Sequence, residues 1–180
     1  VSEVEGVHLF ECQRDLAGCL HAIRKASWRA AAPGGDDPFA REEGPRLPPR
    51  WERLLSSAEH VGGIVDRFPA QERALFETLR CRSLLALPLM VDESWFGFLL
   101  FADLEKLRAW EPWEVTLLSS AAASLSVAIT QRRAEERLLR SEEKYRSVVN
   151  HVREIIFQTD QDGRWVFLNP AWEEIMGHGI

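Results

Sequence analysis

The side chains best suited to metal binding or acid–base chemistry are scattered along this 180-residue chain. The histidines show no metal-ligand spacing such as His-x-x-x-His, and they are His8, His21, His60, His151 and His178. His8 could face a metal or haem from a strand, but a hydrogen-bonded or exposed strand histidine is the simpler interpretation. The sequence also contains no nucleophile elbow, phosphate-binding glycine loop or paired-carboxylate motif. We therefore expect no metal site and no catalysis within this chain.

The cysteines point away from covalent or metal chemistry. Cys12, Cys19 and Cys81 are odd in number and form no Cys-x-x-Cys pair. This pattern argues against a disulfide framework or a zinc site and makes a reducing compartment the default. We interpret Cys12 and Cys81 as small core residues, with a redox role as the alternative.

Three tryptophans offer a different kind of site. Trp51, Trp95 and Trp110 could line a ligand pocket, because aromatic side chains commonly line small-molecule sites. Core packing and hairpin edges explain the same residues equally well. The sequence leaves both interpretations open.

Composition restricts the classes of partner. The net charge of -6 argues against nucleic acid, which would need a basic face, and the 46% hydrophobic content predicts a sizeable core. No uninterrupted apolar run approaches the roughly 18 residues that span a bilayer, and no signal peptide is recognisable. We therefore expect a cytoplasmic protein without a membrane segment.

The elements that must position these residues are predicted from hydrophobic periodicity. Residues 4–12 and 19–28 are expected to be strands, 31–49 a surface loop, 50–57 a helix, 61–65 a short strand and 69–80 a helix. Residues 83–91 and 95–102 are apolar runs joined by a polar turn, which predicts a hairpin in the middle of a sheet. Pro88 then needs a bulge or an open edge, because proline cannot donate to the strand ladder.

One long helix is predicted from Trp113 to about His151. Its first half is apolar, whereas residues 131–137 are charged almost all round. The residues with a 4-3-4 spacing suited to helix packing are Leu118, Ala122, Leu125 and Ile129, and their phase meets Arg132 and Glu136 before Leu139. We predict a parallel homodimer, as in a coiled coil, through this signalling stripe. A solvated connector is an equally economical interpretation.

After this helix, residues 155–159 and 164–168 are predicted to form a second hairpin. Asn169 and Pro170 are expected to cap a short helix over 171–176, which Gly177 ends.

The first part of the chain resembles GAF domains. The resemblance lies in the hairpin Arg82-Ser83-Leu84-Leu85-Ala86-Leu87-Pro88-Leu89 and Trp95-Phe96-Gly97-Phe98-Leu99-Leu100-Phe101, followed by Glu114-Val115-Thr116-Leu117-Leu118. It implies an α+β fold with an antiparallel sheet, flanking helices and a long C-terminal connector helix. The family's usual Asp at the end of the second hairpin strand is replaced by Ala102, with Asp103 next along.

The last part resembles the start of a PAS domain. The matching segments are Glu142-Glu143-Lys144-Tyr145-Arg146, Ile155-Ile156-Phe157-Gln158-Thr159-Asp160 and Phe167-Leu168-Asn169-Pro170-Ala171-Trp172. The two resemblances predict a GAF-like sensory domain over 1–131 without the family's first helix, a helical connector over 132–150, and the truncated PAS start, a hairpin and short helix, over 151–180.

These resemblances imply a regulatory piece of a bacterial two-component sensor, with a histidine kinase as the expected output. The GAF signatures for cyclic nucleotides and for bilins are absent, and Cys19-Leu20-His21 comes nearest to the bilin type. The ligand therefore stays unknown. Alternatives are a ligand-free dimerisation or spacer module, and part of a diguanylate cyclase sensor. Gly34-Gly35-Asp36-Asp37 resembles the acidic signature of those cyclases, although an acidic surface loop explains it better.

Overall fold

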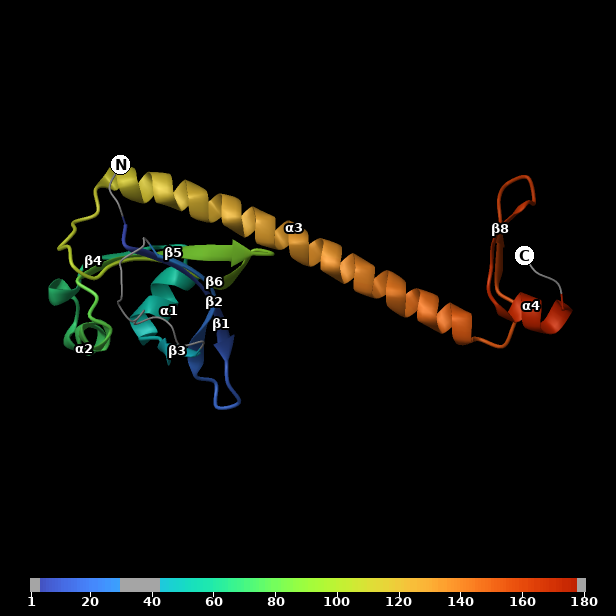
Figure 1. The fold of residues 1–180 in the computed structure, drawn as a ribbon, viewed down its shortest axis with the longest axis horizontal. Coiled ribbons are helices and arrows are strands. Elements are labelled where there is room, and N and C mark those ends of the chain that lie inside the picture. The colour runs from blue at the N-terminus through green and yellow to red at the C-terminus, as the bar shows by residue number, and fades with distance from the viewer. Residues whose placement is uncertain (1–3, 30–42, 178–180) are drawn as a thin grey trace. The chain divides into compact units, whose positions relative to one another are not determined.

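The computed structural model describes residues 4–29 and 43–177 (Figure 1). It divides into two compact units, Val1–Thr130 and Gln131–Ile180, and each is described by itself. The acidic loop Gly34–Asp37 and His178 lie outside the described residues.

The first unit contains a six-stranded antiparallel sheet in the order β3-β2-β1-β6-β5-β4. The strands are β1 (Gly6–Arg14), β2 (Leu20–Arg29), β3 (Glu43–Arg46), β4 (Val61–Ile64), β5 (Ser83–Val91) and β6 (Ser94–Asp103). The helices that follow β3 and β4 are α1 (Pro49–Ser56), the 3-10 turn η1 (Val65–Arg67) and α2 (Ala70–Thr78). This arrangement confirms the predicted α+β class and the interior position of the β5–β6 hairpin.

The strand β3 corrects the prediction of a continuous loop over 31–49. It pairs with β2 through His21 and Ile23 and forms one edge of the sheet. Its sequence, Glu-Gly-Pro-Arg, lacks apolar alternation, and Pro45 is tolerated because an edge strand needs only one set of ladder hydrogen bonds. Pairing with β2, rather than local propensity, therefore makes this segment a strand.

Both faces of the sheet are apolar and must be covered. Successive side chains of a strand point to opposite faces, so Leu84 and Ala86 of β5 belong to one core and Leu85, Leu87 and Leu89 to another. The helices α1 and α2 cover the first face. The helix α3 (Pro112–His151) covers the second with its first half (Figure 1).

The side chain of Glu114 caps the start of α3. The Glu114 carboxylate accepts the backbone N–H of Glu111 at 3.0 Å, which is one half of a capping box. Pro112 takes the first helical position, where a missing N–H costs nothing. From there, Ala122 is buried against the sheet, and Leu118, Leu125 and Ile129 pack around it.

A single hydroxyl joins α3 to the sheet where the ladder is interrupted. The short strand β4 pairs with β5 only as far as Ala86, so Pro88 lies beyond its end, as an edge position requires. The next amide on that side, the N–H of Met90, donates to Ser126 Oγ at 3.1 Å. Ser126 Oγ also donates to the Ala122 carbonyl at 3.0 Å. Ser126 therefore satisfies a strand amide that no neighbouring strand reaches.

The second unit is organised around a buried asparagine. It contains the end of α3, the two-stranded sheet of β7 (Phe157–Thr159) and β8 (Trp165–Leu168), and α4 (Ala171–Met176). Asn169 Oδ1 accepts the Ile156 N–H at 2.9 Å, and its Nδ2 lies near the carbonyls of Val149, Val152 and Glu154. Pro170 takes the predicted cap position of α4, but no side chain caps the helix, and the Asn169 side chain instead ties the hairpin to the end of α3.

Among the described helices, α3 has the length and the apolar composition that a membrane span would need. In its first half, part of that apolar character is used for packing on the sheet. The expectations of a cytoplasmic location and of no membrane segment stay predictions.

Replacing Ser126 tests the link between α3 and the sheet. Ser126→Ala removes the acceptor of the Met90 N–H. We therefore expect its free energy of unfolding, measured in urea, to be about 1 kcal/mol lower than that of the control variant. Ser124→Ala is that control, because Ser124 Oγ donates to the Ser120 carbonyl of its own helix. Both substitutions replace serine by alanine in a helix, so both gain the same helix propensity. Equal stability of the two variants would contradict this role for Ser126.

Candidate functional site

The space between the sheet and the helices α1 and α2 is filled by aromatic side chains. Trp51 stacks on Phe76 with ring centroids 5.0 Å apart, and Phe10 stacks on Phe98 at 5.0 Å. Trp51 also meets the edge of Phe98 at 6.1 Å. The remaining cavity among these rings has a volume of about 20 Å³. Ligand sites usually enclose about 300–1,000 Å³, so the space among these rings has room for little more than a water molecule.

A buried carboxylate holds this aromatic cluster in place. Glu72 of α2 is almost fully buried and accepts the Trp51 indole N–H at 3.0 Å. The same carboxylate oxygen accepts an N–H of Arg50 at 2.7 Å. Glu72 therefore joins α1 to α2, and the Trp51 indole N–H is satisfied within the core.

The three tryptophans predicted as a ligand site do not come together. Trp51 and Trp95 lie on the α1/α2 side of the sheet, where Trp95 donates its indole N–H to the Gly97 carbonyl at 2.6 Å. Trp110 lies on the α3 side, in contact with Phe101. Because the sheet separates them, no single pocket can use all three, and core packing accounts for Trp51.

Open space is found instead along the β4 edge of the sheet, beside α3. One cavity of about 410 Å³ is lined by Arg50, His60, Arg67 and Trp110, among others. A second, of about 290 Å³, is lined by His60, Pro88, Met90 and Ser126. The indole N–H of Trp110 is buried and has no hydrogen-bond partner among the described residues. The Ser126 contact thus lies at the wall of the second cavity.

A charge network joins the end of β6 to the start of α3. Arg108 forms an ion pair with Glu114, lies 3.6 Å from Asp103 Oδ2, and stacks 4.4 Å above the Trp110 ring. Asp103 Oδ1 accepts the Glu5 N–H at 3.1 Å. In the sequence, this network is indicated by Asp103, which follows Ala102 at the position where the family usually has its Asp.

Burial dominates the titration of Asp103. Removal from water raises the pKa of this carboxyl above its ordinary value of 3.8, and the Glu5 N–H and the Arg108 guanidinium oppose the rise. The carboxyl therefore holds its proton more tightly in the folded chain than in the unfolded chain.

His8, Cys12 and Cys81 contribute to the packing of the first unit. His8 is buried, and its Nδ1 lies 3.0 Å from Ser27 Oγ, as expected for a hydrogen-bonded strand histidine. Burial raises the pKa of the Cys12 and Cys81 thiols to about 12, which keeps both protonated. Within residues 4–29 and 43–177, no group of three or more potential ligands could hold a metal ion.

The predicted signalling residues divide between the two units. Leu118, Ala122, Leu125 and Ile129 all pack against the sheet of their own chain. Leu139 lies in the second unit and is exposed. The stripe expected to meet a second helix is therefore occupied, over its first half, by the first unit's own core.

The fold and the site define an α+β domain whose antiparallel sheet is flanked by helices, with a long helix leaving it. The sequence matches the family described as GAF domain over residues 7–129, which is more than half of the chain. This chain belongs to the GAF family, whose domains are sensory and not catalytic.

Solved structures and a curated relative agree with this membership. The GAF domain of PixJ from Thermosynechococcus elongatus, in its blue-light absorbing form, superposes with a TM-score of 0.62 at 17% identity, covering 77% of this chain and 81% of that one. A domain described as part of a two-component sensor histidine kinase of Sinorhizobium meliloti superposes with a TM-score of 0.50 at 14% identity. The match covers 74% of this chain and 84% of that one. At these identities the likeness shows the fold alone.

The curated relative is the methanogenesis regulatory histidine kinase FilI of Methanothrix harundinacea. It is 27% identical over 99 residues, which are 55% of this chain and 11% of that protein. The chain thus spans about a tenth of this relative's length.

Trp51→Ala tests whether the α1/α2 face is filled by the chain itself. We expect the free energy of unfolding to fall by about 3–5 kcal/mol, because a large buried ring is lost and a cavity is left. Added indole should raise the melting temperature of the variant and not that of the original chain. Trp28→Ala, at an exposed strand position, is the control and should be close to neutral. Stabilisation of the unaltered chain by indole would show that the face is open.

The raised pKa of Asp103 predicts a pH-dependent contribution to stability. Its contribution is fully present below pH 3.8 and is lost as pH rises through the higher folded-state pKa. We therefore expect the free energy of unfolding of the original chain to fall relative to that of Asp103→Asn as pH rises. Both free energies are measured across this pH range at constant salt. A difference that moved in the opposite direction would mean that Arg108, rather than burial, controls this carboxyl.

Proposed function

We propose that this chain is a regulatory relay within a sensor histidine kinase. A change in the GAF sheet alters the packing of α3, and α3 carries that change to the hairpin and α4, which begin a PAS domain. The support comes from the GAF membership, from the FilI relative, and from the position of α3. One observation carries the proposal: the helix whose first half completes the sheet's core is the same helix that continues beyond the first unit.

The Ser126 contact is the proposed point of entry of the signal. It lies at the wall of an open cavity, and it couples the β5 amide at Met90 directly to α3. A ligand or partner that moved this edge of the sheet would change whether the Met90 N–H is satisfied. Leaving a buried donor unsatisfied costs about 1–3 kcal/mol, and for the part-buried Met90 N–H a cost of about 1 kcal/mol shifts a two-state equilibrium about fivefold.

The filled α1/α2 face favours one alternative, a ligand-free dimerisation and spacer module. The aromatic cluster leaves about 20 Å³ there, so no small molecule is needed to complete that core. In this alternative α3 spaces its neighbours and carries no change between them. An experiment must therefore distinguish a helix that transmits a change from a helix that only spaces its neighbours.

Amide hydrogen exchange distinguishes the relay from the spacer. In a relay, Ser126→Ala loosens the sheet contact and changes the protection of amides in residues 132–150, beyond the first unit. Ser124→Ala, which leaves the Met90 N–H bonded, should leave those amides unchanged. If the effects of Ser126→Ala end near Gln131, the chain acts as a spacer.

A further inference from the structure

The cavity of about 410 Å³ at the β4 edge gathers basic side chains. Its wall includes Arg50, His60 and Arg67, and none of the described residues that line it is an Asp or a Glu. The chain as a whole carries a net charge of -6, so this wall has the opposite sign from the average surface. Its volume lies within the range of small-molecule sites. The lining therefore favours an anionic ligand over a cation.

The uncompensated positive charge in this wall comes from one arginine. Arg50 already pairs with the buried Glu72 carboxylate at 2.7 Å, so its charge is largely offset. Arg67 is exposed and forms no ion pair with another residue that the structure describes. His60 adds an imidazole, which can donate a hydrogen bond. One free guanidinium matches a ligand with a single negative charge, and its planar fork suits the two oxygens of a carboxylate.

Trp110 adds a buried donor that lacks a partner. Its side chain lines the cavity, and its indole N–H has no hydrogen-bond partner among the described residues. The indole N–H groups of Trp51 and Trp95, in contrast, are both bonded within the first unit. A buried donor without an acceptor is costly, and an oxygen of a bound anion that accepted this N–H would remove the cost.

The rest of the wall is mostly apolar. Phe68, Leu85 and Val115 contribute aromatic and hydrocarbon surface. Gly62 leaves the β4 edge without a side chain at this point, and a Cβ added there would come within 2.8 Å of Leu85 Cδ1. A small inorganic ion would leave this apolar surface in contact with water, whereas an apolar group on the ligand would cover it. The wall therefore fits a carboxylate attached to an apolar group.

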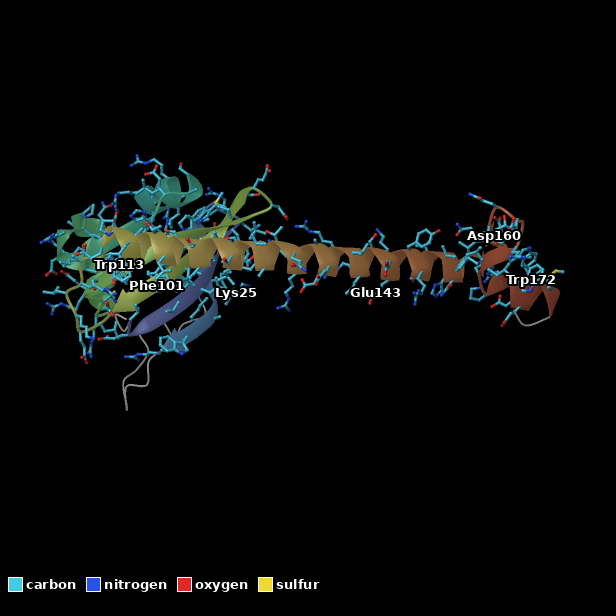
Figure 2. All side chains as sticks on the ribbon, turned by 90° about the horizontal axis from the view of Figure 1, so that it is seen from above. Lys25, Phe101, Trp113, Glu143, Asp160 and Trp172 are labelled. Carbon is cyan, nitrogen blue, oxygen red and sulfur yellow. The ribbon has the colours of Figure 1, made fainter. Side chains whose placement is uncertain are left out.

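We propose that this cavity binds a small monocarboxylate with an apolar body, held by the Arg67 guanidinium and the Trp110 indole N–H. Trp110 precedes α3 and Val115 lies in its first turn, near Trp113 in Figure 2. His60 also lines the second cavity, whose wall includes Ser126. The proposal names a ligand class for the sensory domain. Its link to signalling rests on the relay proposed above, whereas the binding itself does not.

Three probes test the ligand class by isothermal titration calorimetry. Benzoate carries a carboxylate on an apolar ring, benzamide has nearly the same shape without the charge, and inorganic phosphate has charge without an apolar body. We expect benzoate to bind with a Kd below about 1 mM, and the other two to bind at least about tenfold more weakly. Equal binding of benzamide or of phosphate would overturn the proposal. So would the absence of benzoate binding up to about 10 mM.

The matched pair Arg67→Ala and Arg46→Ala tests the location. Both remove an exposed arginine, one at the cavity and the other on β3, at the opposite edge of the sheet. Arg67→Ala should raise the Kd for benzoate about tenfold or more, because a charge-assisted hydrogen bond is lost. Arg46→Ala should leave that Kd unchanged. Melting temperatures check that both variants stay folded. An unchanged Kd in Arg67→Ala would overturn the site.

Trp110→Phe tests the buried donor, because it keeps an aromatic ring and removes the indole N–H. We expect the Kd for benzoate to rise about fivefold and the weak binding of benzamide to change less. Unchanged benzoate affinity in this variant would overturn the hydrogen bond assigned to Trp110. These measurements report binding alone and are independent of hydrogen exchange in residues 132–150. The carboxylate site can therefore fail while the relay stands, and the reverse.

Discussion

The structure depends on the need to cover both faces of one sheet. In β5, the side chains of Leu84 and Ala86 point one way and those of Leu85 and Leu87 the other, and all four are buried. A sheet with two apolar faces is stable only between two layers. The helices α1 and α2 supply one layer, and the first half of α3 supplies the other. This requirement fixes which side of α3 faces inward, and therefore which side remains available.

The two layers differ in how completely they are packed. On the α1/α2 side, Trp51, Phe76 and Phe98 interlock, and Glu72 satisfies the indole N–H, so this half is a finished core. On the α3 side, cavities of about 290 and 410 Å³ lie near the β4 edge. Tight interiors resist small displacements, whereas an incompletely packed contact can take up alternative arrangements at lower cost. The layer that contains α3 is thus the one better suited to regulation.

Polar contacts connect α3 to the sheet at two places. Arg108 joins Asp103, at the end of β6, to Glu114 in the first turn of the helix, and Ser126 holds the Met90 amide three turns later. Hydrogen bonds and ion pairs depend on direction more strongly than apolar contacts do. They define the rotation and position of α3 on the sheet, while the leucines supply most of the burial.

Local patterns in the sequence were sufficient for several elements. The β5–β6 hairpin, the long helix and the Glu114 cap each follow from residues close together in the chain. The strand β3, the role of Asn169 and the Ser126–Met90 bond were not predicted. Each depends on a partner distant in sequence or on an edge left open by another strand. Asn169 looks like a helix cap from its position before Pro170, and only the return of the hairpin to the end of α3 reveals its four backbone partners.

The sequence by itself determined that α3 is long, amphipathic and apolar at heptad spacings, because those properties are periodic and local. It carries two such stripes, one through Leu118, Ala122, Leu125 and Ile129, the other through Trp113, Leu117 and Val127. Only the tertiary structure decided between them. The sheet covers the first stripe in the first unit and leaves the second exposed, and that choice depends on where β5 and β6 place their own leucines. Periodicity shows that a helix has an apolar side, while the neighbouring sheet determines which side is already buried.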